Sequence, residues 1–213
     1  MKLYTYFRSS AAYRVRIALN LKGLSYEAVP VHLVRGEQRQ SDYCKLNPAG
    51  LVPTLEVDGQ ALTQSLAIIE YLEETQGGPA LLPADALGRA RVRALAQAIA
   101  CDTHPLNNLR VLQYLGQSLG VDEAQRTAWY HHWVQLGLGA MERMLADDPR
   151  TGAFCHGDQP TLADCCLVPQ VFNARRFGCS LDAMPTVQRI AAHCEQLEAF
   201  RRAAPEQQPD AAA

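Results

Sequence analysis

The chain has 213 residues and a formal net charge of -2, from 20 lysine and arginine residues against 22 aspartate and glutamate residues. A chain of this length can bury a core without disulfides or metals, and it predicts one or two domains. The near-balance of charge argues against a nucleic acid or an anionic membrane as partner, because both recruit strongly basic surfaces. No stretch has the roughly 18 consecutive apolar residues of a membrane span, and residues 1–7 read as a strand and not as a signal peptide.

Seven cysteines are spread unevenly, at positions 44, 101, 155, 165, 166, 179 and 194. They form no CxxC pair and no cysteine–histidine spacing of a zinc site, so no metal is expected. An odd, unpatterned set is typical of reduced thiols, which predicts a cytoplasmic protein.

The first 75 residues predict a small mixed α/β domain. Strands are expected over 2–7, 26–34, 52–57 and 61–63, with Asp58-Gly59 as a hairpin turn between the last two. Helices are expected over 11–22, briefly after Ser41, and over 66–74, where Ser65 can act as the N-cap. The element order is therefore β-α-β-α-β-β-α.

Residues 75–88 read as a linker, and no convincing strand follows them. Helices are expected over 89–119, 122–145, 162–176 and 184–202. Thr161 and Asp164 form a capping box at the start of the third of these helices, and the tail from Pro205 is expected to be disordered. The sequence thus predicts an α/β domain over residues 1–80 and an all-helical domain over residues 86–213.

Three segments of the first domain could carry chemistry. Ser9 and Ser10 open the first helix, where backbone amides and the helix dipole would stabilise an anion or a thiolate. Gln64-Ser65 repeats this arrangement at another helix start, and a cis bond between Val52 and Pro53 would leave the Val52 backbone open to a peptide-like ligand. Taken one at a time, these residues fit ordinary helix caps and a strand-opening proline equally well.

Longer motifs carry a resemblance over about residues 2–202. They are Ser9–Leu19, Asn47-Pro48 with Val52–Leu55, Gln64–Leu72, Pro105–Leu109, and Gly157-Asp158 with Thr161–Gln170. In these motifs the chain resembles the zeta class of glutathione transferases, which includes maleylacetoacetate and maleylpyruvate isomerases. One position departs from the class, because Ala11 stands where a cysteine often follows the two serines. A mechanism that needs a protein thiol there is put in doubt, whereas one that uses the sulfur of glutathione is not.

The resemblance implies a thioredoxin-like domain followed by a helical domain, a homodimer, and glutathione as cofactor. Ser9 would donate a hydrogen bond to the glutathione sulfur, with Ser10 as the alternative for this role. Asp102 and His104 would come from the same or the neighbouring subunit. The full set of residues expected to bind glutathione is Ser9, Gln38, Val52, Pro53, Gln64, Ser65, Asp102 and His104.

The resemblance also implies a reaction, the cis–trans isomerisation of maleylpyruvate to fumarylpyruvate in gentisate catabolism. The glutathione thiolate would add to the double bond, the resulting single bond would rotate, and the thiolate would leave. Arginines are expected to hold the small dianionic substrate, and beyond residue 80 every basic residue is an arginine. The expected substrate-binding residues are Arg8, which is also assigned to catalysis, and His104, Asn108, Arg110 and Arg176.

Three alternatives stay open at this point. The chain could be a maleylacetoacetate isomerase of tyrosine catabolism, a broad glutathione transferase or peroxidase, or a non-enzymatic interaction module of the same fold. The arginines argue against an apolar electrophile pocket. The serine, Val52-Pro53 and Gln64-Ser65 motifs argue against an interaction module, which would not need a thiol activator.

Overall fold

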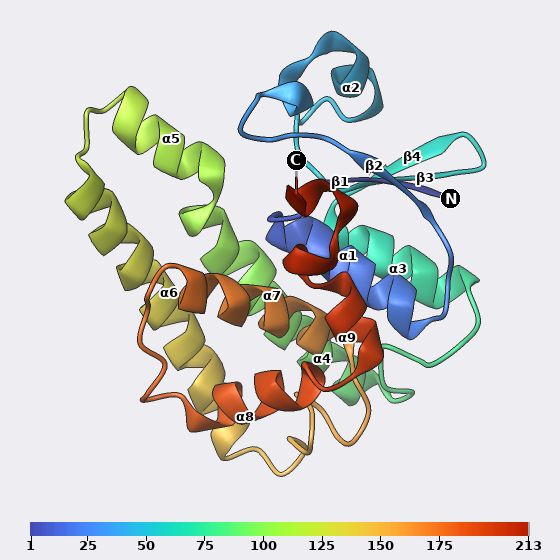
Figure 1. Cartoon of the computed structure of the whole chain (residues 1–213). Coiled ribbons are helices and arrows are strands. Elements are labelled where there is room, and N and C mark those ends of the chain that lie inside the picture. Colours follow the sequence, from blue (N-terminus) through green and yellow to red (C-terminus); the bar gives the residue numbers. More distant parts are fainter. Residues whose placement is uncertain (213) are drawn as a thin grey trace. The chain divides into compact units, whose positions relative to one another are not determined.

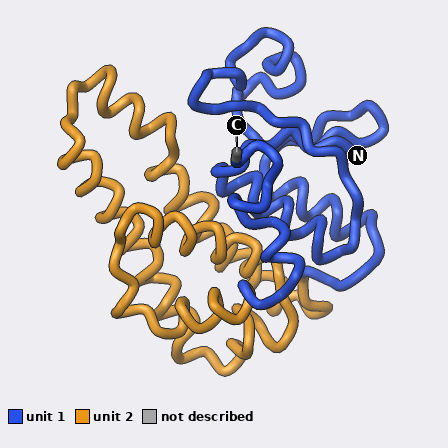
Figure 2. The backbone as a smooth tube through the Cα atoms, viewed as in Figure 1, with its two compact units in different colours: residues 1–81, 195–213 blue, residues 82–194 orange. Residues whose placement is uncertain are grey.

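The computed structural model describes residues 1–212, which form two compact units (Figure 2). Unit 1 contains residues 1–81 and the C-terminal residues from Glu195 onward, and unit 2 contains Leu82–Cys194. The division after Leu81 falls within the expected linker, residues 75–88. The C-terminal segment differs from the prediction, because it packs on unit 1 and not with the other helices that follow residue 86.

Unit 1 is built on a four-stranded mixed sheet with the strand order β2-β1-β3-β4. Its strands are β1 (Lys2–Thr5), β2 (Glu27–Pro30), β3 (Thr54–Val57) and β4 (Gln60–Thr63). β1 pairs in parallel with β2 through a helical crossover and antiparallel with β3, which forms a hairpin with β4. The expected thioredoxin-like β-α-β-α-β-β-α order is confirmed.

The helices of unit 1 cover both faces of this sheet. The helices are α1 (Ser10–Leu21), α2 (Ser41–Leu46) and α3 (Ser65–Thr75). α1 and α3 pack together on one face, and α2 lies on the opposite side (Figure 1). Since side chains alternate along a strand, Leu3 is fully buried toward one face while Tyr4 packs on the other.

The C-terminal segment completes unit 1. It forms α9 (Glu198–Ala203) and two short 3₁₀ turns, Pro205–Gln207 and Pro209–Ala212. α9 packs on α1, and the fully buried Arg16 of α1 donates a hydrogen bond to the Ala203 carbonyl at 3.0 Å. The prediction of a disordered tail was therefore wrong for residues 205–212, and its last residue, Ala213, lies outside the described residues.

Unit 2 is helical throughout its regular structure. Its α-helices are α4 (Ala86–Gln97), α5 (Leu109–Gln117), α6 (Glu123–Ala146), α7 (Leu162–Arg176) and α8 (Pro185–Cys194). The single helix expected over residues 89–119 is wrong, because a π-helical segment (Ala98–Thr103) and a 3₁₀ turn (His104–Asn107) separate α4 from α5. The helix expected over residues 184–202 is likewise two helices, α8 and α9. None of the helices formed by residues 1–212 is both long and apolar enough to cross a membrane.

The start of α7 agrees with the predicted capping box. The fully buried Asp164 carboxylate accepts hydrogen bonds at 2.8 Å from the Thr161 backbone, the Thr161 hydroxyl and the Cys155 backbone. Burial raises the pKa of Asp164, and the hydrogen bonds from Cys155 and Thr161 act in the opposite direction. One side chain thus fixes both the helix start and the loop that precedes it.

Candidate active site

Ser9 lies at the N-cap of α1, as its position after the first strand predicted. Its Oγ accepts a hydrogen bond from the Ala12 backbone N–H at 3.2 Å. Because the oxygen is the acceptor in this bond, the hydroxyl can still donate its own hydrogen. Ser10 follows as the first helical residue and is buried. Ser9 is therefore the hydroxyl placed to act as a donor at the positive end of the α1 dipole.

Gln64, and not Ser65, occupies the N-cap position of α3. The Gln64 backbone has a φ of 68° and a ψ of 115°, in a region that residues other than glycine rarely adopt. Ser65 becomes the first helical residue and is 5% exposed. Strained backbone of this kind persists where the surroundings hold it, and it is concentrated at ligand-binding positions.

Arg14 connects the two helix starts. Its guanidinium donates a hydrogen bond to the Ser65 Oγ at 3.2 Å, and the Arg14 side chain is only 2% exposed. Arg14 is not among the site residues expected from the sequence, which did not predict this link to Ser65. A sequence signal was present, since Arg14 stands on a helix whose neighbouring positions are almost all apolar. Unit 1 therefore places a buried cation beside two helix N-termini.

The Val52–Pro53 peptide bond is cis. Val52 is buried in a cluster with Tyr6, Phe7 and Tyr43. The carbonyl of the preceding Leu51 accepts hydrogen bonds from the Tyr43 hydroxyl at 2.6 Å and from the Asn47 amide at 2.7 Å. Two side chains thus hold the Leu51 carbonyl, just before the cis bond and the start of β3.

Gln38 is buried in the 3₁₀ turn that precedes α2. Its amide nitrogen donates to the Leu33 carbonyl at 3.3 Å. Its Oε1 is buried and, within residues 1–212, has no hydrogen-bond partner. A buried acceptor with no donor is costly, so this oxygen is a candidate for a contact with a ligand.

The predicted residues of unit 2 lie in two segments. Asp102 is exposed in the π-helical segment, His104 begins the 3₁₀ turn, and Asn108 is the N-cap of α5, where its Oδ1 accepts from the Arg110 backbone at 3.1 Å. Arg176 ends α7, with its guanidinium 5.0 Å from the centroid of the Phe177 ring.

Consecutive residues of α6 contact both of these segments. The Trp129 indole donates to the Leu106 carbonyl at 2.7 Å, beside His104 and Asn108. Tyr130 stacks on Phe177, with the ring centroids 3.9 Å apart, next to Arg176. Tyr130 itself is buried. Through α6, unit 2 holds its two arginine-bearing segments in a fixed relation.

Comparisons with known proteins agree with this geometry. Residues 1–74 match the glutathione S-transferase N-terminal domain, and residues 134–196 match the glutathione S-transferase C-terminal domain. The maleylacetoacetate isomerase of Rhizobium meliloti (strain 1021) is 54% identical over 204 residues, which cover 96% of this chain and 95% of that protein.

Two solved structures superpose over nearly the whole chain. One is the holo structure of a maleylpyruvate isomerase described as a bacterial zeta-class glutathione transferase, with a TM-score of 0.96, 53% identity and 99% of both chains covered. The other is the maleylacetoacetate isomerase of Methylobacterium extorquens AM1 with bound malonate and glutathione, with a TM-score of 0.96, 45% identity and 98% of both chains covered. The chain belongs to the glutathione S-transferase family, in the zeta class that contains the maleylpyruvate and maleylacetoacetate isomerases.

Proposed function

We propose that this protein isomerises maleylpyruvate to fumarylpyruvate in the gentisate route of aromatic catabolism, with glutathione as its cofactor. The observation that carries the proposal is the pair of helix starts in unit 1: Ser9 caps α1, and the buried Arg14 of the same helix donates to Ser65 at the start of α3. A hydroxyl donor, two amide-rich helix N-termini and a buried cation together suit an anionic peptide that carries a thiol.

The residues of unit 1 fit glutathione in their donor and acceptor chemistry. Ser65 and the strained Gln64 at the start of α3 would hold the γ-glutamyl carboxylate, with the Arg14 guanidinium behind Ser65. The backbone of Val52, next to Pro53, would pair with the cysteinyl part. The orphaned Oε1 of Gln38 would accept an N–H group from the glycyl end. In unit 2, Asp102 and His104 are assigned to the γ-glutamyl ammonium or the peptide.

Ser9 is the residue assigned to thiol activation, with Ser10 as the alternative. When bound, glutathione supplies a thiolate that adds reversibly to an activated double bond and so allows rotation about it. The Ser9 hydroxyl donates a hydrogen bond to the sulfur, and the N-terminus of α1 favours the negative charge there. No cysteine of the chain is needed for this chemistry, which is compatible with Ala11 after the two serines.

Arginines from both units are assigned to the substrate, together with two polar neighbours. Arg8, Arg110 and Arg176 would bind the two carboxylates and the enolate oxygen that forms during the reaction. His104 and Asn108 would add hydrogen bonds from the segment that carries Arg110. The malonate in the Methylobacterium extorquens neighbour supports a dicarboxylate, since malonate is a small dianion of this type.

A second candidate substrate is maleylacetoacetate, the intermediate of tyrosine catabolism. The Rhizobium meliloti maleylacetoacetate isomerase is 54% identical to this chain, and the protein of the maleylpyruvate isomerase structure is 53% identical. Sequence identity therefore supports both substrates to the same degree. Both substrates present the same conjugated cis double bond between carboxylate-bearing arms. The residues assigned above therefore serve either reaction.

One assay tests the function and separates the candidates. The purified protein is given maleylpyruvate, maleylacetoacetate or a chlorinated aromatic electrophile, each with catalytic glutathione. We expect turnover of maleylpyruvate without loss of glutathione, at a higher kcat/KM than maleylacetoacetate. A reversed ratio would select the second candidate, and stoichiometric glutathione consumption on the aromatic substrate would indicate a general transferase instead.

We also propose a homodimer in the cytoplasm. The dimer rests on the likeness to the zeta class, and sedimentation equilibrium of the full chain measures it. The location rests on the cysteines, all of which are free thiols in this structure, as a reducing compartment favours.

A further inference from the structure

The C-terminal segment returns to the loop that leads into the candidate active site. α9 is held on α1 by two side-chain contacts, from Arg16 to the Ala203 carbonyl at 3.0 Å and from Asn20 to the Ala199 carbonyl at 2.9 Å. The end of α9 is therefore held at a fixed point on α1.

Gln208 then turns the chain back toward β1. This residue is buried, and its side-chain amide donates to the carbonyls of Arg202 and Ala204, both at 2.9 Å. The following turn places Ala211 against the cluster that contains Phe7 and Val52. The described tail is thus packed into unit 1 through buried polar and apolar contacts.

Asp210 contacts the backbone just before Ser9. Its side chain is buried, at 9% exposure, and its Oδ2 accepts a hydrogen bond from the Phe7 backbone N–H at 2.9 Å. A carboxylate accepting from a backbone amide is among the stronger hydrogen bonds in proteins, and burial shields it from water. Phe7 lies two residues before Ser9 and next to Arg8.

Further backbone contacts of this loop are made by Arg16 and within the loop itself. Arg16 donates to the Phe7 carbonyl at 3.0 Å and to the Tyr6 carbonyl at 3.4 Å, while the Ser9 N–H donates to the Tyr6 carbonyl at 2.9 Å. Asp210 thus holds the amide side of Phe7 and Arg16 holds its carbonyl side. The peptide groups before Ser9 are clamped between a buried anion and a buried cation.

We propose that Asp210 is a positioning residue for catalysis: its carboxylate fixes the Phe7 amide and thereby the orientation of the Ser9 hydroxyl toward the cofactor sulfur. The inference rests on the proposed role of Ser9. It assigns a task to the C-terminal segment, which is separated from Ser9 by 201 positions in the sequence.

The test uses the full-length protein with glutathione bound. The pKa of the bound thiol is measured from the ultraviolet absorbance of the thiolate as a function of pH, alongside kcat, KM and the thermal midpoint. We expect Asp210→Ala to raise the thiol pKa by about one unit and to lower kcat roughly tenfold, with KM for the substrate little changed. Asp210→Asn keeps an acceptor oxygen and should recover at least half of both losses.

A matched control comes from the same tail. Glu206→Ala removes one exposed carboxylate and changes the net charge equally, so it should leave the thiol titration unchanged. Amide hydrogen exchange at Phe7 adds a readout that does not depend on turnover, and Asp210→Ala should accelerate it. Asp210→Ala with a lowered thermal midpoint but a wild-type thiol titration would overturn the proposal, because the contact would then be merely structural.

Ser9→Ala separates this inference from the proposed function. If Ser9→Ala leaves the thiol titration unchanged, the proposed role of Ser9 fails. If Ser9→Ala raises the thiol pKa and Asp210→Ala does not, only the role of Asp210 fails. Should Asp210→Ala not fold, an Asp210→Asn protein with wild-type titration and wild-type exchange at Phe7 would equally overturn the inference.

Discussion

Arg8 and Arg176, two of the three arginines assigned to the substrate, share a local arrangement. Each guanidinium lies over the ring of an adjacent phenylalanine, Arg8 at 4.7 Å from the Phe7 centroid and Arg176 at 5.0 Å from the Phe177 centroid. A cation stacked on an aromatic face keeps its planar fork in one orientation while it stays open to solvent. This shared orientation supports the proposed role of both side chains in binding substrate carboxylates.

The Arg8→Ala variant tests the assignment of Arg8 to the substrate. Loss of a charge-assisted contact to a carboxylate should raise KM for maleylpyruvate by about 10- to 100-fold, with the Kd of glutathione nearly unchanged. Steady-state kinetics and calorimetric glutathione binding measure the two quantities. Arg143→Ala, which removes an exposed arginine of α6, is the charge-matched control. An equal loss of glutathione affinity in Arg8→Ala would count against the assignment to substrate.

Residue-level reasoning from the sequence reached Ser9 and included Gln64 in the site, but it predicted neither the backbone conformation of Gln64 nor the contact made by Arg14. A serine after a strand and before an apolar helix is a local signal, so its capping position could be predicted. The positive φ of Gln64 is imposed by its surroundings, and glutamine itself gives no indication of it. The partner of Arg14 is Ser65, 51 positions away, and a contact at that separation exists only after folding.

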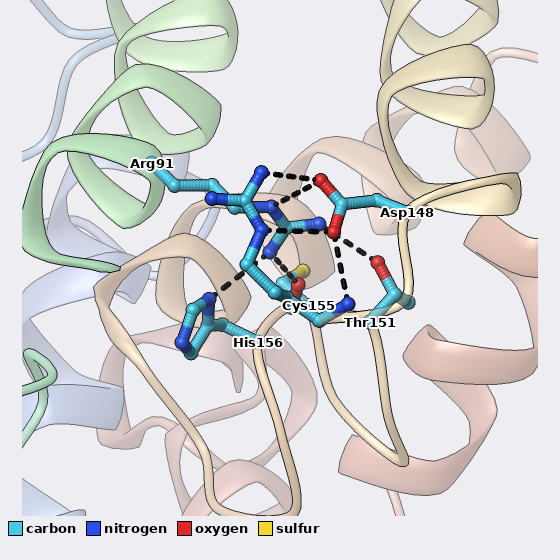
Figure 3. Close-up of polar contacts among 6 residues, drawn as sticks. Arg91, Asp148, Thr151, Cys155 and His156 are labelled. Atoms are coloured by element: carbon cyan, nitrogen blue, oxygen red, sulfur yellow. Dashed lines mark hydrogen bonds and ion pairs between the residues drawn. The ribbon is translucent and has the colours of Figure 1, made fainter. Parts of the chain in front are cut away.

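At the scale of elements, the loop between α6 and α7 is fastened to α4 by one side chain. Arg91 of α4 forms an ion pair with Asp148 at 3.0 Å and donates to the Cys155 carbonyl at 2.6 Å and to the Thr151 hydroxyl at 2.8 Å (Figure 3). Hydrogen bonds from Arg150, together with one hydrogen bond and the positive charge of Arg91, hold the pKa of the Asp148 carboxyl well below its usual range.

His156 belongs to the same cluster and gives the loop a pH dependence. Its Nδ1 lies 3.2 Å from the Arg91 guanidinium, which can only donate, so this nitrogen is assigned as an unprotonated acceptor (Figure 3). Burial, and then the charges of Arg91 and Arg150, lower the pKa of His156 below its ordinary value. As the pH falls below that ordinary value, His156 takes up a proton more readily in the unfolded chain than in the folded protein. The folded state therefore loses stability as the pH falls.

The free energy of unfolding should fall as the pH is lowered from neutral to below the ordinary histidine pKa of about 6.5. We expect this fall to be smaller in His156→Gln. Urea unfolding at a series of pH values measures this slope. His132→Gln, a substitution at an exposed histidine of α6, should keep the slope of the unchanged protein. A His156→Gln slope that matches the original would remove His156 as the titrating group.

Element boundaries were predictable where a local signal exists. The Asp164 capping box fixed the start of α7, and Asp58-Gly59 fixed the β3–β4 hairpin. The break between α4 and α5 was missed although Pro105 lies within it, because the apolar periodicity continues on both sides. The break between α8 and α9 has no glycine or proline to mark it. There the chain leaves unit 2 for unit 1, which is decided by tertiary packing.

At the scale of the whole molecule, unit 1 is built from both ends of the chain. The last helix supplies Phe200 and Ala203, whose side chains are fully or almost fully buried. A composition rich in alanine and proline made the tail from Pro205 read as disordered, but Asp210 in this tail is buried and bonds Phe7, 203 positions earlier. The predicted limits of this domain, residues 1–80, therefore left out a segment that packs with it in one compact unit.

A chain that ends after Cys194 tests whether unit 1 depends on the C-terminal segment. It retains every residue assigned to glutathione, yet it loses the packing of α9 on α1, and removal of one buried phenylalanine alone costs about 3–5 kcal/mol. We expect a loss of thermal stability of at least that size and no retention on immobilised glutathione. Calorimetry and affinity chromatography measure the two outcomes.

The control is Glu198→Ala in the full chain, which breaks an exposed ion pair of α9 with Arg201 and should change stability by less than about 0.5 kcal/mol. If the truncated chain binds glutathione as well as the full chain, the domain limits predicted from the sequence are correct after all.

The burial of the cysteines has a consequence for the lifetime of the enzyme. Five of the seven thiols are buried, and burial raises the pKa of Cys155, Cys165 and Cys179, which keeps them in the unreactive protonated form. An activated alkene such as maleylpyruvate alkylates thiolates without discrimination. The reacting sulfur belongs to glutathione, and most thiols of the protein are buried. Only the exposed Cys101 and the half-buried Cys44 are therefore accessible to alkylation by the substrate.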